Sequence, residues 1–525
     1  MNKLALGTCP AESQTKPARL VAAKGGRFRR SHVMPRLGAL LWSLGLALLV
    51  LYLLFYLSRA ADLIAYPYDV DQGEGYDVNS GWLLAQGRPI YTDNADYPYY
   101  SSNYPPVFSL LLAPIVAQTG PLLGSGRALS AIAALLTAAL IGAIVWERTA
   151  NGPAATTAGL LYLGSNYVYH VTPLARVNAL AALFALIGVY CCLRRANRTV
   201  VRAPVDGWLV GAVAAFVLAM FTKQTTIDAV AAGLLFLLAR DRRAGLVASA
   251  AVGALGIALL FGIDAVHGGQ FWVNVVVGNV NPFLPEQVLR YFLNFLGLHG
   301  ILVALAGWHV SRTVRRGAWG PFELYWALAL ALAVSVGKWG AGESYFLAPI
   351  VASCVLAGLL LGEAGRWSAR RPRALALLGG LVFVQAMLLA HGPLADLVPG
   401  LRDRGIQAAT LVRHRNTADI DAAAQLVERL RELEGPVLAE DPGYSLVAGK
   451  EVVGNATHLR NLHQAGIWRA EGLLADVAER RFRWVVLNAE LYPEPILEAV
   501  GRAYYLHDFF DVNGTRQQLF APGEE

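Results

Sequence analysis

Apolar segments long enough to cross a lipid bilayer recur through most of this chain. Such runs, of roughly 16–22 residues, recur between 35 and 390, and about 20 apolar residues span the ~30 Å hydrocarbon core as a helix. Only 15% of the 525 residues are charged, against about a quarter in an ordinary soluble domain. The sequence therefore predicts a polytopic α-helical membrane protein with about eleven spans. They are placed near 37–57, 129–146, 155–169, 174–193, 208–221, 226–239, 246–261, 291–310, 322–336, 345–361 and 374–390.

Basic residues predict how these spans are oriented. Cytoplasmic loops of membrane proteins carry an excess of Lys and Arg. Segment 1–36 is basic, and alternate loops after it hold arginines at Arg148, Arg194, Arg195, Arg240, Arg242, Arg312, Arg315, Arg366 and Arg373, among others. We expect 1–36 to be cytoplasmic, and the net charge of +7 to reflect orientation and not a nucleic-acid partner. Stretch 105–116 is interpreted as interfacial or re-entrant. A span there would move every later loop to the opposite side of the membrane and place the arginine clusters outside.

An odd number of spans leaves the C-terminal end on the outer side. Charged residues become more frequent after about 392, and helical and strand-like patterns of a soluble domain appear. The predicted domains are a transmembrane domain at 37–392, with a first outer loop at 58–127, and an outer α/β domain at 393–525. Within the outer domain we expect helices at 419–434 and 472–480 and strands at 436–439, 483–487 and 518–520.

The first outer loop carries candidate catalytic acids. Asp69, Asp71 and Glu74 lie together after the first span. A carboxylate can take a proton from an acceptor hydroxyl or stabilise a positively charged sugar transition state. The same acids also suit a solvated turn, because Gly73 and Gly75 lie among them. The residues do not decide which of the three acids would act as the base. No cofactor is indicated firmly, although the spacing of Asp69 and Asp71 could hold a divalent metal such as Mg²⁺ or Mn²⁺.

Further polar residues lie at the outer ends of the spans, at positions where the hydropathy of a membrane helix alone would not call for polar side chains. Charges at membrane depth cost free energy and tend to mark function. Because several segments place such residues on one face, we predict one substrate cavity, in which lysine and arginine neutralise a phosphate. Interfacial snorkelling and aromatic belts are the competing interpretation. The candidate substrate-binding residues are Lys223, Gln224, Lys338, Glu343, Tyr345, Arg176, Arg290, Tyr104 and Asn166.

Several motifs resemble those of bacterial GT-C glycosyltransferases, the broad family of protein O-mannosyltransferases, aminoarabinose transferases and rhizobial galacturonosyltransferases. They are Asp-Gln-Gly-Glu-Gly from Asp71, Leu-Leu-Ala-Gln-Gly-Arg-Pro-Ile-Tyr from Leu83, Asn-Tyr-Pro-Pro from Asn103, Thr-Lys-Gln from Thr222, and Gly-Ala-Gly-Glu-Ser-Tyr-Phe-Leu from Gly340. The order of these motifs and their location on one side carry the resemblance, which extends over nearly the whole chain from Leu37. The sequence departs from the family in two places. The loop lacks a contiguous Asp-Glu pair, and Asn178 stands where many relatives carry an acid.

The resemblance implies a GT-C-like fold and a place in the bacterial inner membrane. It further implies an inverting transfer from a polyprenyl-phosphate sugar donor on the periplasmic face, with Asp71 as the best-matching acid. The expected partners are that donor, a glycan, lipid or protein acceptor, and membrane lipids. The alternative function is a transporter or flippase of a polyprenyl-linked or small anionic substrate, which should show inverted repeats and broken helices. A non-catalytic scaffold is a third hypothesis, under which the first-loop acids would be replaceable without loss of function.

Overall fold

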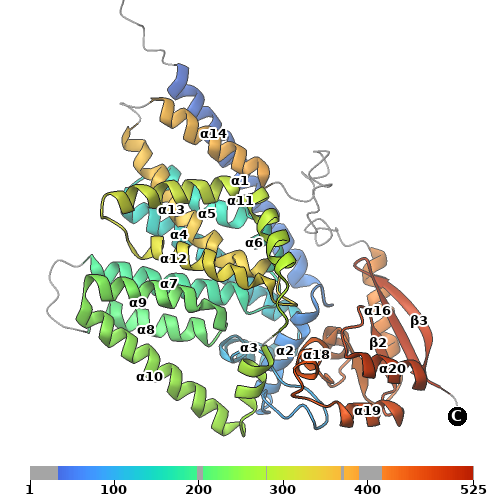
Figure 1. Cartoon of the computed structure of the whole chain (residues 1–525). Helices are drawn as coiled ribbons and strands as arrows, with labels where there is room; N and C mark the ends of the chain where they lie inside the picture. Colours follow the sequence, from blue (N-terminus) through green and yellow to red (C-terminus); the bar gives the residue numbers. More distant parts are fainter. Residues whose placement is uncertain (1–32, 198–204, 280, 368–371, 390–416, 524–525) are drawn as a thin grey trace, which may run out of the picture.

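A helical bundle and a smaller α/β domain make up the chain (Figure 1). The computed structural model describes residues 33–197, 205–279, 281–367, 372–389 and 417–523. Most of the predicted basic segment 1–36 and the predicted domain boundary at 392–393 lie outside the described residues.

Each of the eleven predicted apolar runs overlaps a helix of the bundle, although the run at 155–169 is divided at Ser165 between two helices, and the run at 322–336 continues from a helix into a 3-10 turn. Among the described residues, six helical segments are long and apolar enough to cross a membrane. This confirms the predicted polytopic helical class, while the number of crossings stays a prediction. The bundle helices are α1 (Val33–Ala65), α4 (Leu123–Thr149), α5 (Gly152–Gly164), α7 (Asn178–Ala196), α8 (Gly207–Met220), α9 (Ile227–Arg240), α10 (Arg242–Val266), α11 (Pro285–Arg315), α12 (Pro321–Leu332), α13 (Leu347–Trp367) and α14 (Pro372–Leu388).

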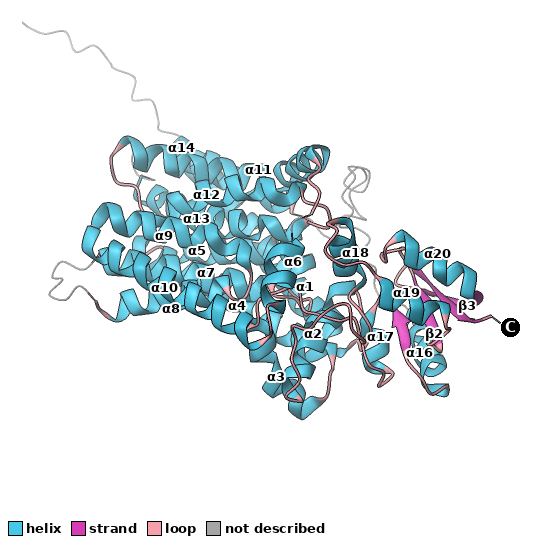
Figure 2. Cartoon of the chain, turned by 60° about the horizontal axis from the view of Figure 1, so that its bottom comes forward, coloured by secondary structure: helices cyan, strands magenta, loops and turns pink. Residues whose placement is uncertain are grey.

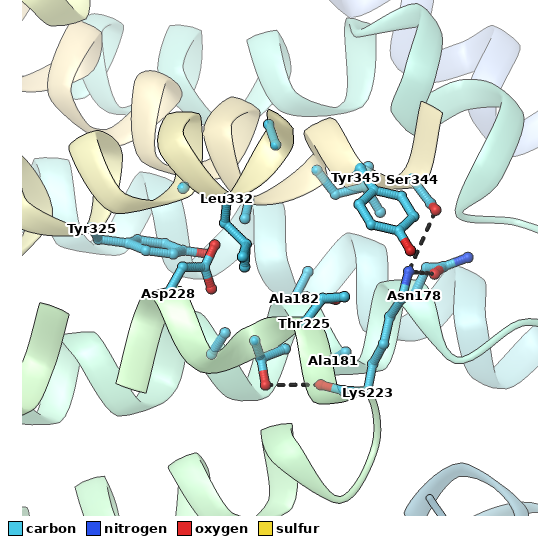
Figure 3. Close-up of a pocket in the computed structure, with 16 residues that line it drawn as sticks. Asn178, Ala181, Ala182, Lys223, Thr225, Asp228, Tyr325, Leu332, Ser344 and Tyr345 are labelled. Atoms are coloured by element: carbon cyan, nitrogen blue, oxygen red, sulfur yellow. Dashed lines mark hydrogen bonds between the residues drawn. The ribbon is translucent and has the colours of Figure 1, made fainter. Parts of the chain in front are cut away.

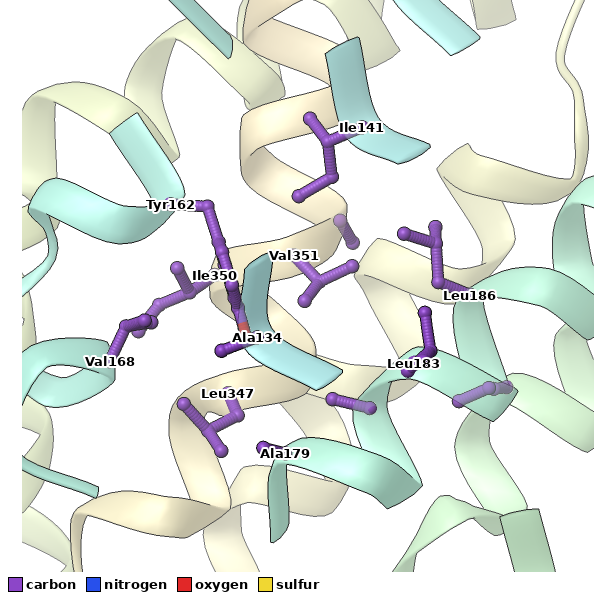
Figure 4. Close-up of a cluster of buried hydrophobic side chains, with 14 of the residues drawn as sticks. Ala134, Ile141, Tyr162, Val168, Ala179, Leu183, Leu186, Leu347, Ile350 and Val351 are labelled. Carbon is purple, nitrogen blue, oxygen red and sulfur yellow. The ribbon is translucent and has the colours of Figure 1, made fainter. Parts of the chain in front are cut away.

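Helix α13 is the centre of the bundle. Of its most apolar stretch 83% is buried within the protein, against 11% for α10, so α10 leaves most of its apolar surface to the surroundings. Figure 4 shows the side chains around α13, where Ile350 and Val351 pack against residues of α4, α5 and α7. A helix that is apolar all round is stable only in such a position or in lipid.

Helices α1 and α14 run side by side along one edge of the bundle (Figure 1). Glycines allow their backbones to approach closely. A Cβ on Gly379 would lie 2.1 Å from the backbone oxygen of Gly38, and a Cβ on Gly38 would lie 2.6 Å from Cα of Ala376. Small residues at such crossings are typical of helices packed within membranes.

Short elements connect the bundle helices at the end that faces the α/β domain. They are α2 (Gln72–Ala85), α3 (Val107–Thr119), α6 (Asn166–Val171), η1 (Gln224–Thr226), η2 (Trp272–Val276), η3 (Val277–Asn279), η4 (Ala333–Gly337) and η5 (Glu343–Phe346). Helix α3 covers the stretch that we predicted as interfacial or re-entrant, and it is only 13 residues long.

The α/β domain holds a four-stranded sheet in the order β1-β2-β4-β3, which Figure 2 shows grouped at one end of the molecule. Strand β1 pairs parallel with β2, and the other pairs are antiparallel. The predicted helices and strands are present, whereas β3 was not predicted. It pairs with β4 across Asn513 and Gly514, which both have positive φ, as two-residue hairpin turns require. The elements are α16 (Thr417–Glu432), β1 (Val437–Ala439), α17 (Pro442–Val447), α18 (Ala456–Gln464), α19 (Glu471–Ala478), β2 (Trp484–Leu487), α20 (Glu494–Ala503), β3 (Tyr504–Val512) and β4 (Thr515–Pro522).

Candidate active site

Asp71 is fixed in place because it begins helix α2. Its backbone is extended, and its carboxylate accepts the N–H of Gly73 at 3.1 Å, as an N-cap residue does. Glu74 reaches back and accepts the N–H groups of Asp71 and Val70 at 3.3 and 3.1 Å. The Asp-Gln-Gly-Glu sequence is therefore a capping box, which holds the Asp71 carboxylate at the first turn of the helix.

Glu74 is fully buried and paired with Arg127 of α4. Its two carboxylate oxygens accept from Arg127 Nε and Nη2, both at 2.7 Å, and one also accepts the N–H of Ala175 at 2.8 Å. Arg127 also donates to the backbone oxygens of Leu63, Tyr66 and Tyr68. Burial acts to raise the pKa of Glu74, but the Arg127 guanidinium holds it below its ordinary value. This pair joins the first loop to α4 and to the segment before α7.

Arg176 connects two carboxylates of α2. Its Nη1 lies 2.6 Å from Asp71 Oδ1, and its Nε lies 3.2 Å from Asp77 Oδ2. The guanidinium also lies over the ring of Tyr104, 5.8 Å from its centroid. Burial raises the pKa of Asp77 to about 7, although Arg176 acts in the opposite direction. The pair of acids and the arginine form one charged group at the start of α2.

Two lysines lie at the ends of other bundle helices. Lys223 follows α8, and its Nζ donates to Asn178 Oδ1 at 2.7 Å and to Ser344 Oγ at 3.4 Å, as Figure 3 shows. Its ammonium lies 5.0 Å from the ring centroid of Tyr345. Burial, and next the positive charge of Arg176, lower the pKa of Lys223 to about 7. Lys338 donates to the backbone oxygen of Asn279.

These charged groups line a polar cavity of about 630 Å³ that adjoins an apolar one of about 750 Å³. The polar cavity lies among the start of α2, the segment before α7, the loop 338–345 and helix α18 of the α/β domain. The apolar cavity is lined mainly by α8, η1, α9, α10 and η2. Five residues line both cavities and so mark the junction between them: Tyr104, Lys223, Asn279, Lys338 and Tyr345.

Seven of the twelve predicted site residues line the polar cavity: Asp71, Tyr104, Arg176, Lys223, Lys338, Glu343 and Tyr345. Glu343 lies 3.8 Å from Nδ1 of His170, another residue of the lining. The other five predicted residues are absent from this lining.

Glu74 is enclosed by Arg127, and the buried carboxylate of Asp69 accepts the N–H of Gly443 in the α/β domain. Gln224 lines only the apolar cavity, where it donates to the backbone oxygen of Val275. Arg290 is exposed on α11 over the ring of Tyr291, and Asn166 is buried at the start of α6.

The structure also places in the cavity residues that the sequence analysis did not select. Asp77 lies four residues after Gly73, which also lines the cavity, so a helix start at Gln72 would have placed the two residues on one face. The remaining additions include Asn455, Thr457 and Asn461 around α18. No sequence pattern connects the α18 residues with the first loop, because they are more than 350 residues apart in the chain.

Asp69 and Asp71 do not form a metal site such as one for Mg²⁺ or Mn²⁺. The Asp69 carboxylate is directed to the α/β domain and the Asp71 carboxylate to Arg176, so the two do not converge on one point. Across the described part of the chain, no group of three His, Cys, Asp or Glu side chains could hold a metal ion. The Asp69 and Asp71 carboxylates therefore do not fit such a cation.

Comparisons with known proteins agree on the fold. Residues 103–264 match the family described as dolichyl-phosphate-mannose-protein mannosyltransferase. The structure is similar to ArnT from Cupriavidus metallidurans bound to undecaprenyl phosphate, with a TM-score of 0.58 and 14% identity over 91% of this chain and 99% of that chain. The apo state of ArnT gives a TM-score of 0.58 and 15% identity over the same shares.

A second similar structure is archaeal. The oligosaccharyltransferase AglB from Archaeoglobus fulgidus, in complex with an inhibitory peptide and a dolichol-phosphate, has a TM-score of 0.50 and 14% identity. The alignment covers 91% of this chain and 74% of that chain. No curated protein matches the sequence.

Proposed function

We propose that this membrane glycosyltransferase of the GT-C class transfers a sugar from a polyprenyl-phosphate donor to a glycan, lipid or protein acceptor. The observation that carries the proposal is the junction of the two cavities, where Lys223 and Lys338 lie. A lipid-linked sugar needs an apolar channel, a cationic point for its phosphate and a polar chamber for the sugar, in that order. The two adjoining cavities supply these three environments in the same order.

The proposed reaction inverts the configuration at the sugar carbon. The Asp71 carboxylate accepts the proton of an acceptor hydroxyl, whose oxygen forms a bond to the anomeric carbon. The bond from that carbon to the phosphate oxygen breaks, and the phosphate leaves with the electron pair. Lys223 and Lys338 neutralise the charge that develops on the leaving group. The anionic phosphate would also favour the charged form of Lys223.

Asp69 and Glu74 receive no catalytic role in this proposal. Both are buried in contacts that hold the loop, outside the lining of the polar cavity. Asp71 is the acid of the three that lines it, and Arg176 fixes the direction of its carboxylate. Arg176 is a positioning residue with respect to Asp71.

We propose that the site lies on the periplasmic side of the bacterial inner membrane. Helix α7 begins beside the cavity at Asn178 and carries Arg194 and Arg195 in its last turn, and α9 begins next to η1 and ends at Arg240. The arginines therefore lie at the far ends of these helices, where the positive-inside rule expects the cytoplasm. In the same proposal, 37–392 is the membrane domain, its loop 58–127 carries the acid, and 393–525 is the periplasmic domain.

Substitution of Lys223 by methionine is expected to weaken donor binding about 10- to 100-fold, because a hydrogen bond to a charged group is worth about 1.5–3 kcal/mol. The purified chain is reconstituted in vesicles with undecaprenyl phosphate that carries mannose, aminoarabinose or galacturonate. Envelope extract from a strain deleted for the chain supplies unmodified acceptor, and mass spectrometry follows the product. Lys450→Met, whose ammonium donates to Leu433 in the α/β domain, is the control.

Two results would contradict the proposal. If the donor concentration at half-saturation is the same in the Lys223 variant as in the wild type, Lys223 does not bind the donor phosphate. Movement of the lipid-linked sugar across wild-type vesicles without a covalent product would indicate a transporter.

Substitution of Gly73 by alanine should lower transfer about 100-fold, because a Cβ there would lie 1.0 Å from Arg176 Nη1 and displace the guanidinium from Asp71. Helix α2 should remain folded, since alanine favours a helix more than glycine does. The measurement is kcat at saturating donor, with Gly262→Ala in α10 as the control, because a Cβ at Gly262 meets nothing within 4 Å. Equal kcat for the two variants would show that Arg176 does not position Asp71.

A further inference from the structure

Helix α18 of the α/β domain forms one wall of the polar cavity. Thr457 and Asn461 both line it, and they lie four residues apart, on the same face of the helix. His458 and Leu462 follow on the neighbouring face, which packs on η3. A Cβ on Gly278 would lie 2.7 Å from His458 Cε1 and 2.8 Å from Leu462 Cδ2. The contact with η3 therefore directs the Thr457–Asn461 face into the cavity.

Hydrogen bonds fasten this wall to the helix that carries Asp71. Thr457 donates to Gln72 Oε1 at 2.9 Å, and Gln72 donates to the backbone oxygen of Glu440 at 3.1 Å. The Tyr76 hydroxyl donates to the same oxygen and accepts the N–H of Ala456 at 3.1 Å. These bonds place α18 beside the first turn of α2.

A third element holds the other side of α18. His458 Nε2 lies 2.8 Å from Asn274 Oδ1 in η2. The Arg460 guanidinium lies 5.0 Å from the ring centroid of Trp339, which lines the cavity as well. With both sides held, the wall cannot turn away without breaking buried contacts, so its polar groups face a fixed position.

Asn461 has a hydrogen-bonding atom without a partner. The residue is only 7% exposed, and within the described residues its Oδ1 is buried and accepts no hydrogen bond. Asn281 Oδ1, in the same cavity lining, is likewise buried and unsatisfied among those residues. An unsatisfied buried polar group costs about 1–3 kcal/mol, which a bound hydroxyl would recover. The wall therefore fits a ligand that donates hydrogen bonds.

We infer that Asn461 and Thr457 bind hydroxyl groups of the acceptor and so help to determine which acceptor is used. The inference rests on the function proposed above. Neither residue lines the apolar cavity or its junction with the polar one, so they are separated from the donor phosphate. Thr457 adjoins Asp71 through its hydrogen bond to Gln72, and Asn461 lies one turn further along the same face of α18. An inverting base must lie next to the acceptor hydroxyl. The side chains of this wall are uncharged amides and a hydroxyl, which suits a neutral, hydroxyl-bearing group.

The test is the variant Asn461→Leu, which keeps the approximate volume and removes the hydrogen bonds. Transfer is measured with a saturating undecaprenyl-phosphate-linked sugar while the amount of envelope extract from the deletion strain is varied. The half-saturating amount of extract should rise about tenfold, whereas half-saturation by the donor should stay within twofold of wild type. The matched control is Gln464→Ala, an exposed amide on the same helix.

Each result decides the inference. A half-saturating amount of extract equal to that of the Gln464 variant, or a shift in the donor value instead, would overturn it. If the leucine variant does not fold, Asn461→Ala is measured in the same way and judged by the same outcomes. Absence of transfer by the wild-type chain would overturn the proposed function together with this inference, while wild-type transfer that is insensitive to Asn461 would overturn the inference alone.

Discussion

Substitution of Asp71 by asparagine is expected to lower the rate of sugar transfer about 10²–10⁴-fold, because general base catalysis typically contributes a factor of that size. Asparagine keeps the side-chain oxygen that caps α2, so the helix should still begin at Gln72. What is lost is the group that accepts the proton and the negative charge beside Arg176. The measurement is single-turnover transfer with donor and acceptor both saturating.

The control for this variant is Asp96→Asn, an exposed acid in the same loop, which should transfer at the wild-type rate. The thermal transition of both variants in detergent should match that of the wild type. Transfer by Asp71→Asn within tenfold of wild type would refute the assignment of the base. The remaining carboxylate at the start of α2, Asp77, would then be the next candidate, since it lines the same cavity.

The fold could be predicted because a membrane helix depends mainly on its own sequence. An apolar run of spanning length is local information, and the arginines between runs are local as well. Strand β3 was missed because half of its residues face outward, so its pattern does not resemble a buried strand. The Asn513-Gly514 turn was the available signal for that hairpin.

The cavity could be predicted in part for a similar reason. Arg176, Lys223 and Lys338 are conspicuous because they follow or precede apolar runs on the predicted outer side, where the positive-inside rule does not expect basic residues. The individual environments of Asp69 and Glu74 could not be predicted, because they depend on partners far away in the chain. Glu74 pairs with Arg127, and Asp69 bonds to Gly443, which is 374 residues later. The contribution of α18 is hidden for the same reason.

The Glu74–Arg127 pair explains how the segment between α1 and α4 holds Asp71, the proposed base, in a fixed position. Both side chains are fully buried, and the guanidinium makes five hydrogen bonds, to the carboxylate and to three backbone oxygens. The capping box joins this pair directly to Asp71. Any movement of Glu74 therefore also moves the Asp71 carboxylate.

Substitution of Arg127 by methionine is consequently expected to destabilise the protein by about 3–5 kcal/mol, because it leaves the Glu74 carboxylate buried without a counter-charge. The free energy of unfolding is measured by denaturant titration in detergent. The control is Arg194→Met, which breaks the partly exposed pair with Glu147 at 2.8 Å and the contacts of Arg194 with Tyr190 and Trp208, and should cost no more than about 2 kcal/mol. Adding Glu74→Gln to the Arg127 variant should restore part of the stability, since it removes the unpaired charge, but not transfer, because Asp71 stays loosely held. Equal stability of the two arginine variants would mean that the buried pair does not hold the loop.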